Sequence, residues 1–135
     1  MASDRLWEDR GSKIVILDTN AILMLFELNI NLESELKRII GNYKIIIPKK
    51  VYDELVFFSN KINGKKKIYS KASLDLIKKY EIVESFEKDA DNAVFLLAKK
   101  TNGIVVTNDK DLRKSLKEKS IKVLFLRAKK KLELE

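Results

Sequence analysis

The chain has 135 residues, of which 45% are hydrophobic and 36% are charged, as is typical of one globular domain. It contains no cysteine and no histidine, which excludes disulfides, thiolate or imidazole metal ligands and a Ser-His-Asp triad. Lys and Arg number 28 against 20 Asp and Glu, a net charge of +8, which favours a polyanionic partner such as RNA, DNA or an anionic membrane. The alternative is a solvated surface covered with lysines. Metal chemistry in such a chain would depend on carboxylates, which suit Mg²⁺ or Mn²⁺.

The first twelve residues differ from the rest of the sequence. Residues 1–12 lack the apolar core of a signal peptide, and the chain contains no run of about 18 apolar residues that could cross a bilayer. We interpret 1–12 as a disordered leader or a tag, and 13–135 as a single domain. We expect a cytoplasmic protein that does not associate with membranes.

Strand-like and helix-like segments alternate from residue 13 onwards. In the first half, the pattern predicts these elements in order: a strand at 13–17, helices at 18–28 and 31–40, a strand at 43–47, a helix at 49–60, and a basic loop at 61–71 that passes into a helix ending at 80.

The second half continues the alternation. It predicts these elements in order: a short strand at 81–86, a helix at 87–101, a strand at 103–107, a helix at 108–120, a strand at 121–126, and a charged tail at 127–135. Apolar strands separated by helices are typical of right-handed crossovers in a parallel sheet. The chain is therefore expected to be an α/β protein with helices on both faces of the sheet.

Four acidic residues are predicted to lie where strands end and helices begin. Asp18 and Asp109 follow predicted strands, whereas Glu54 and Asp91 lie in helices at the border of the buried face. Because functional sites of open α/β sheets form at the carboxyl ends of the strands, these side chains are expected to meet there. Repulsion among them would raise their pKa values or require a counter-ion, which a divalent cation provides.

Each acidic residue also has an ordinary structural explanation. Asp18 or Asp109 could cap a helix, Asp91 could complement a helix dipole, and Glu54 could be a solvated helix residue. Asp89 and Asp111 are close rivals of Asp91 and Asp109. The argument for a metal site therefore depends on the four acids occurring together.

At these positions the sequence resembles the PIN-domain nucleases. Four segments carry the resemblance, in order: ILDTNAIL at 16–23 with Asp18 and Asn20, IIIPKKVYDEL at 45–55 with Glu54, DADNAVFLLA at 89–98 with Asp91 selected over Asp89, and IVVTNDKDL at 104–112 with Thr107, Asn108, Asp109 and Asp111. The resemblance extends over most of the chain. The C-terminal end of the sequence resembles archaeal PIN proteins of ribosomal-RNA processing, and VapC-type toxins are also similar to this chain.

The resemblance implies a three-layer α/β/α sandwich with a central parallel sheet of about five strands. It implies a metal-dependent endoribonuclease, in which Asp18, Glu54, Asp91 and Asp109 hold one or two Mg²⁺ or Mn²⁺ ions that activate a water. Supporting roles fall to Asn20, Thr107, Asn108 and Asp111. The partners it implies are RNA, a second copy of the chain, and an antitoxin or a pre-ribosomal particle.

A run of lysines is the candidate RNA contact. The basic loop and the helix that follows it contain Lys61, Lys65, Lys66, Lys67 and Lys71, and lysines bind the phosphate backbone. The alternative for these residues is a solvated loop.

Two other functions are compatible with parts of the sequence. The first is an RNA-binding ribosome-assembly factor whose acidic pocket is intact but catalytically idle. The second is a phosphotransfer domain in which Asp18 is the nucleophile, but Asn20 stands where the haloacid-dehalogenase loop needs a second Asp. A metal-dependent nuclease accounts for all four acids.

Overall fold

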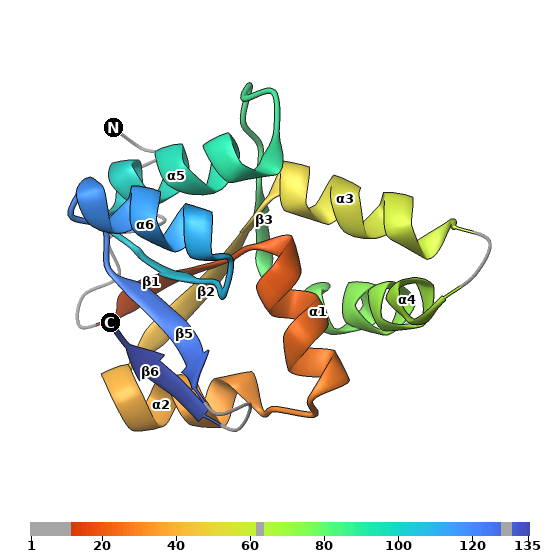
Figure 1. The fold of residues 1–135 in the computed structure, drawn as a ribbon, viewed down its shortest axis with the longest axis horizontal. Coiled ribbons are helices and arrows are strands. Elements are labelled where there is room, and N and C mark those ends of the chain that lie inside the picture. Colours follow the sequence, from red (N-terminus) through yellow and green to blue (C-terminus); the bar gives the residue numbers. More distant parts are fainter. Residues whose placement is uncertain (1–11, 62–63, 128–130) are drawn as a thin grey trace.

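A single sheet joins the strands of the chain in this computed structural model, which describes residues 12–61, 64–127 and 131–135 (Figure 1). The strands are β1 (Lys13–Leu17), β2 (Tyr43–Pro48), β3 (Glu81–Val83), β4 (Ile104–Val106), β5 (Val123–Arg127) and β6 (Lys131–Leu134). Their order is β3-β2-β1-β4-β5-β6, and the first five are parallel. The predicted leader falls almost wholly at 1–11, outside the described residues.

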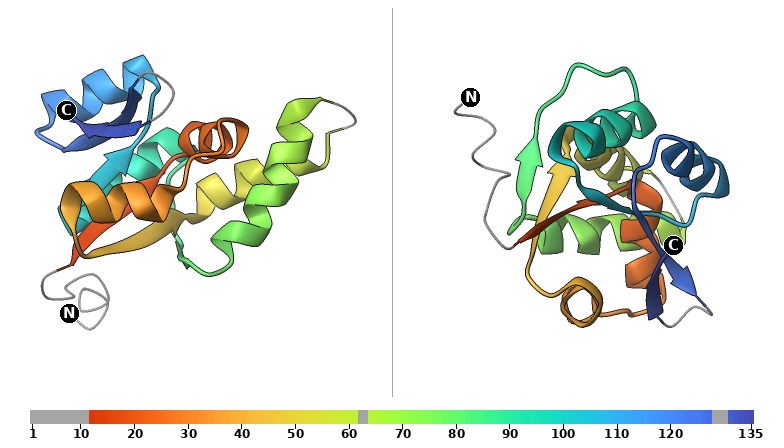
Figure 2. Two further views of the ribbon diagram at one scale, coloured as in Figure 1. Left: turned by 90° about the horizontal axis from the view of Figure 1, so that it is seen from below. Right: turned by 90° about the vertical axis from the view of Figure 1, so that its left-hand side faces the viewer.

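Helices cover both faces of this sheet, as expected. They are α1 (Thr19–Glu27), α2 (Leu32–Ile40), α3 (Lys49–Ser59), α4 (Lys65–Ile77), α5 (Ala90–Thr101) and α6 (Lys110–Glu118). On one side lie α1, α2 and α4, and on the other lie α5 and α6 (Figures 1 and 2). The α3–α4 pair projects beyond the sheet as a hairpin. Among the described residues, no helix is long and apolar enough to cross a membrane.

The central strands consist of continuous apolar runs because both of their faces are covered. In β1, four of the five residues are buried, and all three residues of β4 are buried. Parallel pairing puts Leu17 beside Val106 at the carboxyl ends of β1 and β4. The residues that follow these two strands are therefore neighbours in space.

The prediction of a charged tail at 127–135 is wrong in part, because residues 131–134 form the strand β6. This strand pairs antiparallel with β5, so the sheet has six strands rather than about five. Leu132 is buried at 2% exposure, its N–H donates to Glu35 Oε1 (2.9 Å), and its carbonyl accepts from Arg38 Nη2 (3.0 Å). The alternation in KLEL is too short to distinguish a strand from a tail without α2 in place.

Acidic side chains begin three helices at the carboxyl edge of the sheet. Asp18, Asp89 and Asp109 are the N-caps of α1, α5 and α6, and each accepts a backbone N–H from the first turn of its helix. Carboxylates are favoured there because they satisfy free N–H groups and complement the helix dipole. The capping geometry thus fixes the backbone on which the candidate site stands.

The assignment of β6 to the core can be tested with two leucines of that strand. Leu132→Ala should lower the free energy of unfolding by about 2–4 kcal/mol, because it leaves a cavity in a packed position. Leu134→Ala, at a position 44% exposed, should change the free energy of unfolding by less than about 1 kcal/mol. Urea denaturation measures both, and equal small effects would show that residues 131–134 are a tail.

Candidate active site

Asp18 is a carboxylate buried at the end of the central strand, with 4% of its surface exposed. Its Oδ1 accepts the N–H of Ala21 (2.7 Å) and its Oδ2 accepts the hydroxyl of Thr107 (2.5 Å). Buried polar groups need such partners. The side chain is therefore held in one orientation, at the point where β1 and β4 end together.

Thr107 connects Asp18 to the start of α6. Its hydroxyl donates to Asp18 and accepts the backbone N–H of Asp109 (3.1 Å). The Asp109 carboxylate in turn accepts the N–H of Leu112 (3.0 Å) as the N-cap of α6. Thr107 is fully buried, so this chain of bonds sets the spacing between the two acids.

Glu54 reaches the same edge from α3. Its Oε1 accepts the hydroxyl of Thr19, the residue directly after Asp18. Thr19 was not among the residues that the sequence predicted, although it orients one of them. The only sign of this role in the sequence is a hydroxyl side chain next to Asp18. Its partner, Glu54, lies 35 residues away, so the spacing of residues along the sequence does not reveal the contact.

Asp91 occupies the first turn of α5, two residues after the cap. Asp89 accepts the N–H of Asn92 (2.8 Å) and so performs the capping role. Asp91 is left on the exposed side of the turn. The two neighbouring acids at this helix start therefore have different surroundings.

Electrostatics link the acids from these four elements. The pKa of Asp18 is raised to about 6, mainly by burial. The charges of Asp91 and Asp109 also raise this pKa, whereas the hydrogen bonds from Thr107 and Ala21 lower it. We name the set of Asp18, Glu54, Asp91 and Asp109 the acidic edge.

The pKa of Asp91 shows the same mutual repulsion. Partial burial of the carboxylate is the largest cause of the rise, and the charges of Asp109, Asp89 and Glu54 add to it. A charge that raises a neighbour's pKa across space is close enough to repel it. The acidic edge is therefore a concentration of negative charge in a protein that is otherwise basic.

A divalent cation suits this set of donors. Among the described residues, no three acidic side chains stand close enough to hold one ion directly. Mg²⁺, however, keeps several of its waters in proteins and binds through one or two carboxylates. An ion held directly by one or two members of the acidic edge, and by the others through water, would relieve their repulsion.

The four predicted supporting residues have different surroundings. Thr107 contacts two of the acids, as described. Asn108 instead exchanges two hydrogen bonds with the backbone of Leu126 (3.2 and 2.6 Å) and so joins the turn to β5. Asn20 is exposed on the first turn of α1, and Asp111 lines a hollow between α5 and α6.

The five predicted RNA-binding lysines lie along the α3–α4 hairpin. Lys61 follows α3, and Lys65, Lys66, Lys67 and Lys71 belong to α4. The ammonium of Lys61 lies 4.8 Å from the ring centroid of Phe57, and that of Lys66 lies 4.3 Å from that of Phe58. The hairpin therefore presents positive charge together with aromatic rings.

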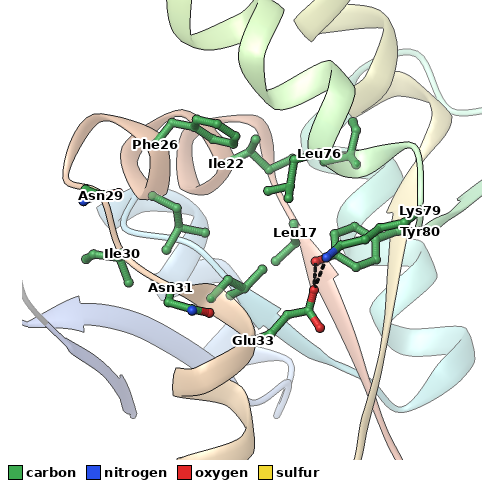
Figure 3. A pocket seen from close by; sticks show the side chains of 13 residues that line it. Leu17, Ile22, Phe26, Asn29, Ile30, Asn31, Glu33, Leu76, Lys79 and Tyr80 are labelled. Carbon is green, nitrogen blue, oxygen red and sulfur yellow. Dashed lines mark hydrogen bonds and ion pairs between the residues drawn. The ribbon is translucent and has the colours of Figure 1, made fainter.

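A further cavity among the described residues is lined by no member of the acidic edge. It has a volume of about 690 Å³ and is lined mainly by apolar side chains of α1, α2 and α4 (Figure 3). At its rim, Glu33 accepts the hydroxyls of Tyr43 and Tyr80 (2.7 Å each) and pairs with Lys79 (2.5 Å). Lys79 and the two tyrosines lower the pKa of Glu33 to about 2, so this carboxylate is unsuited to proton transfer near neutral pH.

Comparisons with known sequences identify close relatives. The family model described as "PIN like domain" matches residues 15–129. Ribonuclease VapC4 of Methanocaldococcus jannaschii is 34% identical over 124 residues, which cover 89% of this chain and 95% of that protein. Ribonuclease VapC9 of Archaeoglobus fulgidus is 28% identical over 137 residues, which cover 100% and 98%.

Solved structures share the fold. The PIN domain endonuclease Utp24 superposes with a TM-score of 0.76 at 23% identity, covering 93% of this chain and 92% of that one. VapBC2 of Rickettsia felis, solved on a DNA fragment from its promoter, gives a TM-score of 0.57 at 19% identity, covering 75% and 92%. At these identities the likeness shows the architecture alone.

The raised pKa of Asp18 predicts a dependence of stability on pH. Because its pKa of about 6 exceeds the ordinary 3.8, protonated Asp18 favours the fold. This stabilisation is complete below about pH 4 and is lost as the pH rises to about 6. Asp18→Asn removes the buried charge and should raise the free energy of unfolding at pH 7 by about 2–3 kcal/mol.

Urea denaturation between pH 4 and 7.5 with EDTA measures this effect. The gain from Asp18→Asn should shrink towards pH 4. Asp75→Asn, at an exposed position of α4, serves as the control and should show no such pH window. A loss of stability in Asp18→Asn that is equal at every pH would contradict the buried-charge account.

Proposed function

Because this chain belongs to the family of PIN-like domains, we propose that it is a metal-dependent endoribonuclease. The observation that carries the proposal is the electrostatic coupling of carboxylates from four separate elements at the acidic edge. Relatives named ribonuclease cover almost the whole chain and support RNA as the substrate. Products with 5′-phosphate and 3′-hydroxyl ends are expected from the family resemblance.

The residues of the acidic edge would divide the work between holding a cation and orienting water. One or two Mg²⁺ or Mn²⁺ ions, when bound, supply Lewis-acid activation of water and stabilise charge on the phosphoryl oxygens. Asp18 is the most rigid of the four, since two hydrogen bonds fix it. Thr19 holds the Glu54 carboxylate towards the same edge and is a positioning residue.

Binding of RNA is assigned to the α3–α4 hairpin. Its lysines lie on the exposed side of the hairpin apart from Lys67, which is half-buried. Phe57 is 60% exposed, and exposed aromatic rings beside cations suit unpaired bases. Negative charge at the acidic edge repels phosphate, so attraction has to come from a neighbouring basic surface such as this one.

For the role in the cell, the relatives favour action as a VapC-type toxin over a part in ribosomal-RNA processing. The two ribonucleases named VapC match by sequence over the whole domain, whereas the likeness to Utp24 shows the fold. An antitoxin is the corresponding partner, and the apolar cavity bounded by α1, α2 and α4 offers it a surface separate from the acidic edge. Formation of a homodimer and association with a pre-ribosomal particle remain predictions.

Two neighbouring aspartates at the start of α5 give the sharpest test of the enzyme. Asp91→Asn should reduce cleavage of end-labelled structured RNA by at least about 100-fold, because it removes a member of the acidic edge. Asp89→Asn is the matched control, since Asn caps helices as well as Asp, and it should retain most of the activity. Cleavage is measured with Mn²⁺, with Mg²⁺ and with EDTA, and EDTA should abolish it.

Three other outcomes would count against the proposal. Activity that persists in Asp91→Asn or in EDTA would contradict the metal-dependent site. RNA binding without cleavage by the wild-type protein would instead indicate the idle assembly factor. Expression in a growing bacterial culture tests the toxin role with the same pair, and growth unaffected by the wild-type chain would contradict it.

The role of the hairpin predicts a salt dependence of RNA binding. Replacing Lys65 and Lys66 by Gln should reduce the slope of log K against log salt concentration by about 0.7 for each phosphate that the variant no longer neutralises. The control pair, Lys37→Gln and Lys122→Gln, changes the net charge equally in α2 and ahead of β5. Equal slopes for both pairs, measured by fluorescence anisotropy, would show that the hairpin acts only through net charge.

A further inference from the structure

A hollow between α5 and α6 opens beside the acidic edge. It has a volume of about 310 Å³, and Asp91 lines it on one side while Asp111 lines it on the other. This volume is at the lower end of the range for small-ligand sites and suits a single nucleotide better than a longer segment. Because the hollow shares Asp91 with the acidic edge, a nucleotide held there would adjoin the scissile phosphate.

The two helices present matching rows of side chains along this hollow. On α5 the row is Asp91, Phe95 and Lys99, of which Asp91 and Phe95 line the hollow. The facing row is Asp111 and Ser115 of α6 followed by Lys119, the C-cap of that helix, and all three line the hollow. Residues four apart lie on the same face of a helix, and both helices start at the carboxyl edge of the sheet. Each row therefore runs from an acid at the edge, through a middle residue, to a lysine one further turn away.

The helix dipole does not explain the aromatic residue in the middle of the hollow. Acids in the first turn and lysines towards the last turn complement the helix dipole, so the charged residues alone have an ordinary cause. Phe95 has no electrostatic cause of this kind; it packs partly against the hydrophobic core and leaves part of its ring exposed. Its ring is half-exposed, and the ammonium groups of Lys99 and Lys119 lie 5.9 and 5.8 Å from its centroid.

An aromatic ring with two cations near it has the chemistry of a site for one unpaired nucleotide. Bases stack on aromatic side chains whatever their sequence, and lysines bind the adjoining phosphate. Asn92 and Ser115 border the same hollow and add polar groups that can bond the edge of a base.

We propose that the α5–α6 hollow binds one unpaired nucleobase of the RNA next to the cleaved bond. The base stacks on Phe95, and the phosphate beyond it lies between Lys99 and Lys119. The inference rests on the proposed nuclease function and adds to it a requirement for single-stranded RNA at that position. Phe95 is thus a specificity-determining residue.

Binding of a single-stranded RNA decamer tests the proposal without cleavage. The measurements use the wild-type protein with EDTA, in which no cleavage is expected, and the decamer carries one photoreactive 5-iodouridine. Phe95→Leu keeps an apolar side chain but removes the aromatic face, and it should weaken binding about tenfold. Ser115→Leu fills the hollow from the exposed side of α6, leaves Phe95 unchanged, and should weaken binding to a similar extent.

Matched controls separate stacking from general effects. Phe86→Leu makes the same change at a fully exposed phenylalanine between β3 and α5 and should leave affinity unchanged. A duplex of the same sequence should lose little affinity on Phe95→Leu, because its bases are not free to stack. Photocrosslinking followed by mass spectrometry should place the modified residue at Phe95 or at its neighbours in the hollow.

The outcomes distinguish this inference from the proposed function. Unchanged affinity in both Phe95→Leu and Ser115→Leu, or no binding by the parent protein, overturns the inference. If the wild-type enzyme still cleaves RNA in that case, the nuclease assignment survives. A crosslink at Phe95 together with the predicted loss of affinity supports the hollow as a nucleotide site, even if the wild-type chain cleaves nothing.

Discussion

Burial of one carboxylate, Asp18, is the constraint around which the site is arranged. An ionised carboxylate is costly to bury, and this one is almost fully enclosed at the end of the central strand. Hydrogen bonds from Ala21 and Thr107 offset part of that cost. Burial and the neighbouring acids still raise the pKa of Asp18 to about 6. Such an arrangement is what the proposed cation site requires, because a bound cation would offset the buried charge.

The same constraint explains why the other acids come from different elements. Parallel strands bring their carboxyl ends to one edge, and the helices that begin there carry acids at their N-caps or within their first two turns. Thr107 joins two of these starts through a single hydroxyl, and Thr19 joins α1 to Glu54 on α3. The fold thus sets the positions of the carboxylates through neutral hydroxyl groups, which add no further charge.

Much of this arrangement follows from the sequence because it depends on local patterns. Apolar runs predict the parallel strands, and acids that follow a strand directly or after two residues make Asp18 and Asp109 candidates for the site. What escaped prediction depends on contacts between distant segments. β6 becomes recognisable only when Glu35 and Arg38 of α2 bind the backbone of Leu132. The contact of Thr19 with Glu54 and the pairing of the two rows along α5 and α6 likewise require the folded chain.

Proton release on binding of Mn²⁺ tests the central claim most directly. Calorimetric titration at pH 6, in two buffers with different ionisation enthalpies, gives the number of protons released per ion. A cation at the acidic edge should displace on the order of half a proton from Asp18, whose pKa is about 6. Asp18→Asn should abolish that release and weaken binding. Binding without proton release, or with equal affinity in Asp18→Asn, would contradict a cation site built around Asp18.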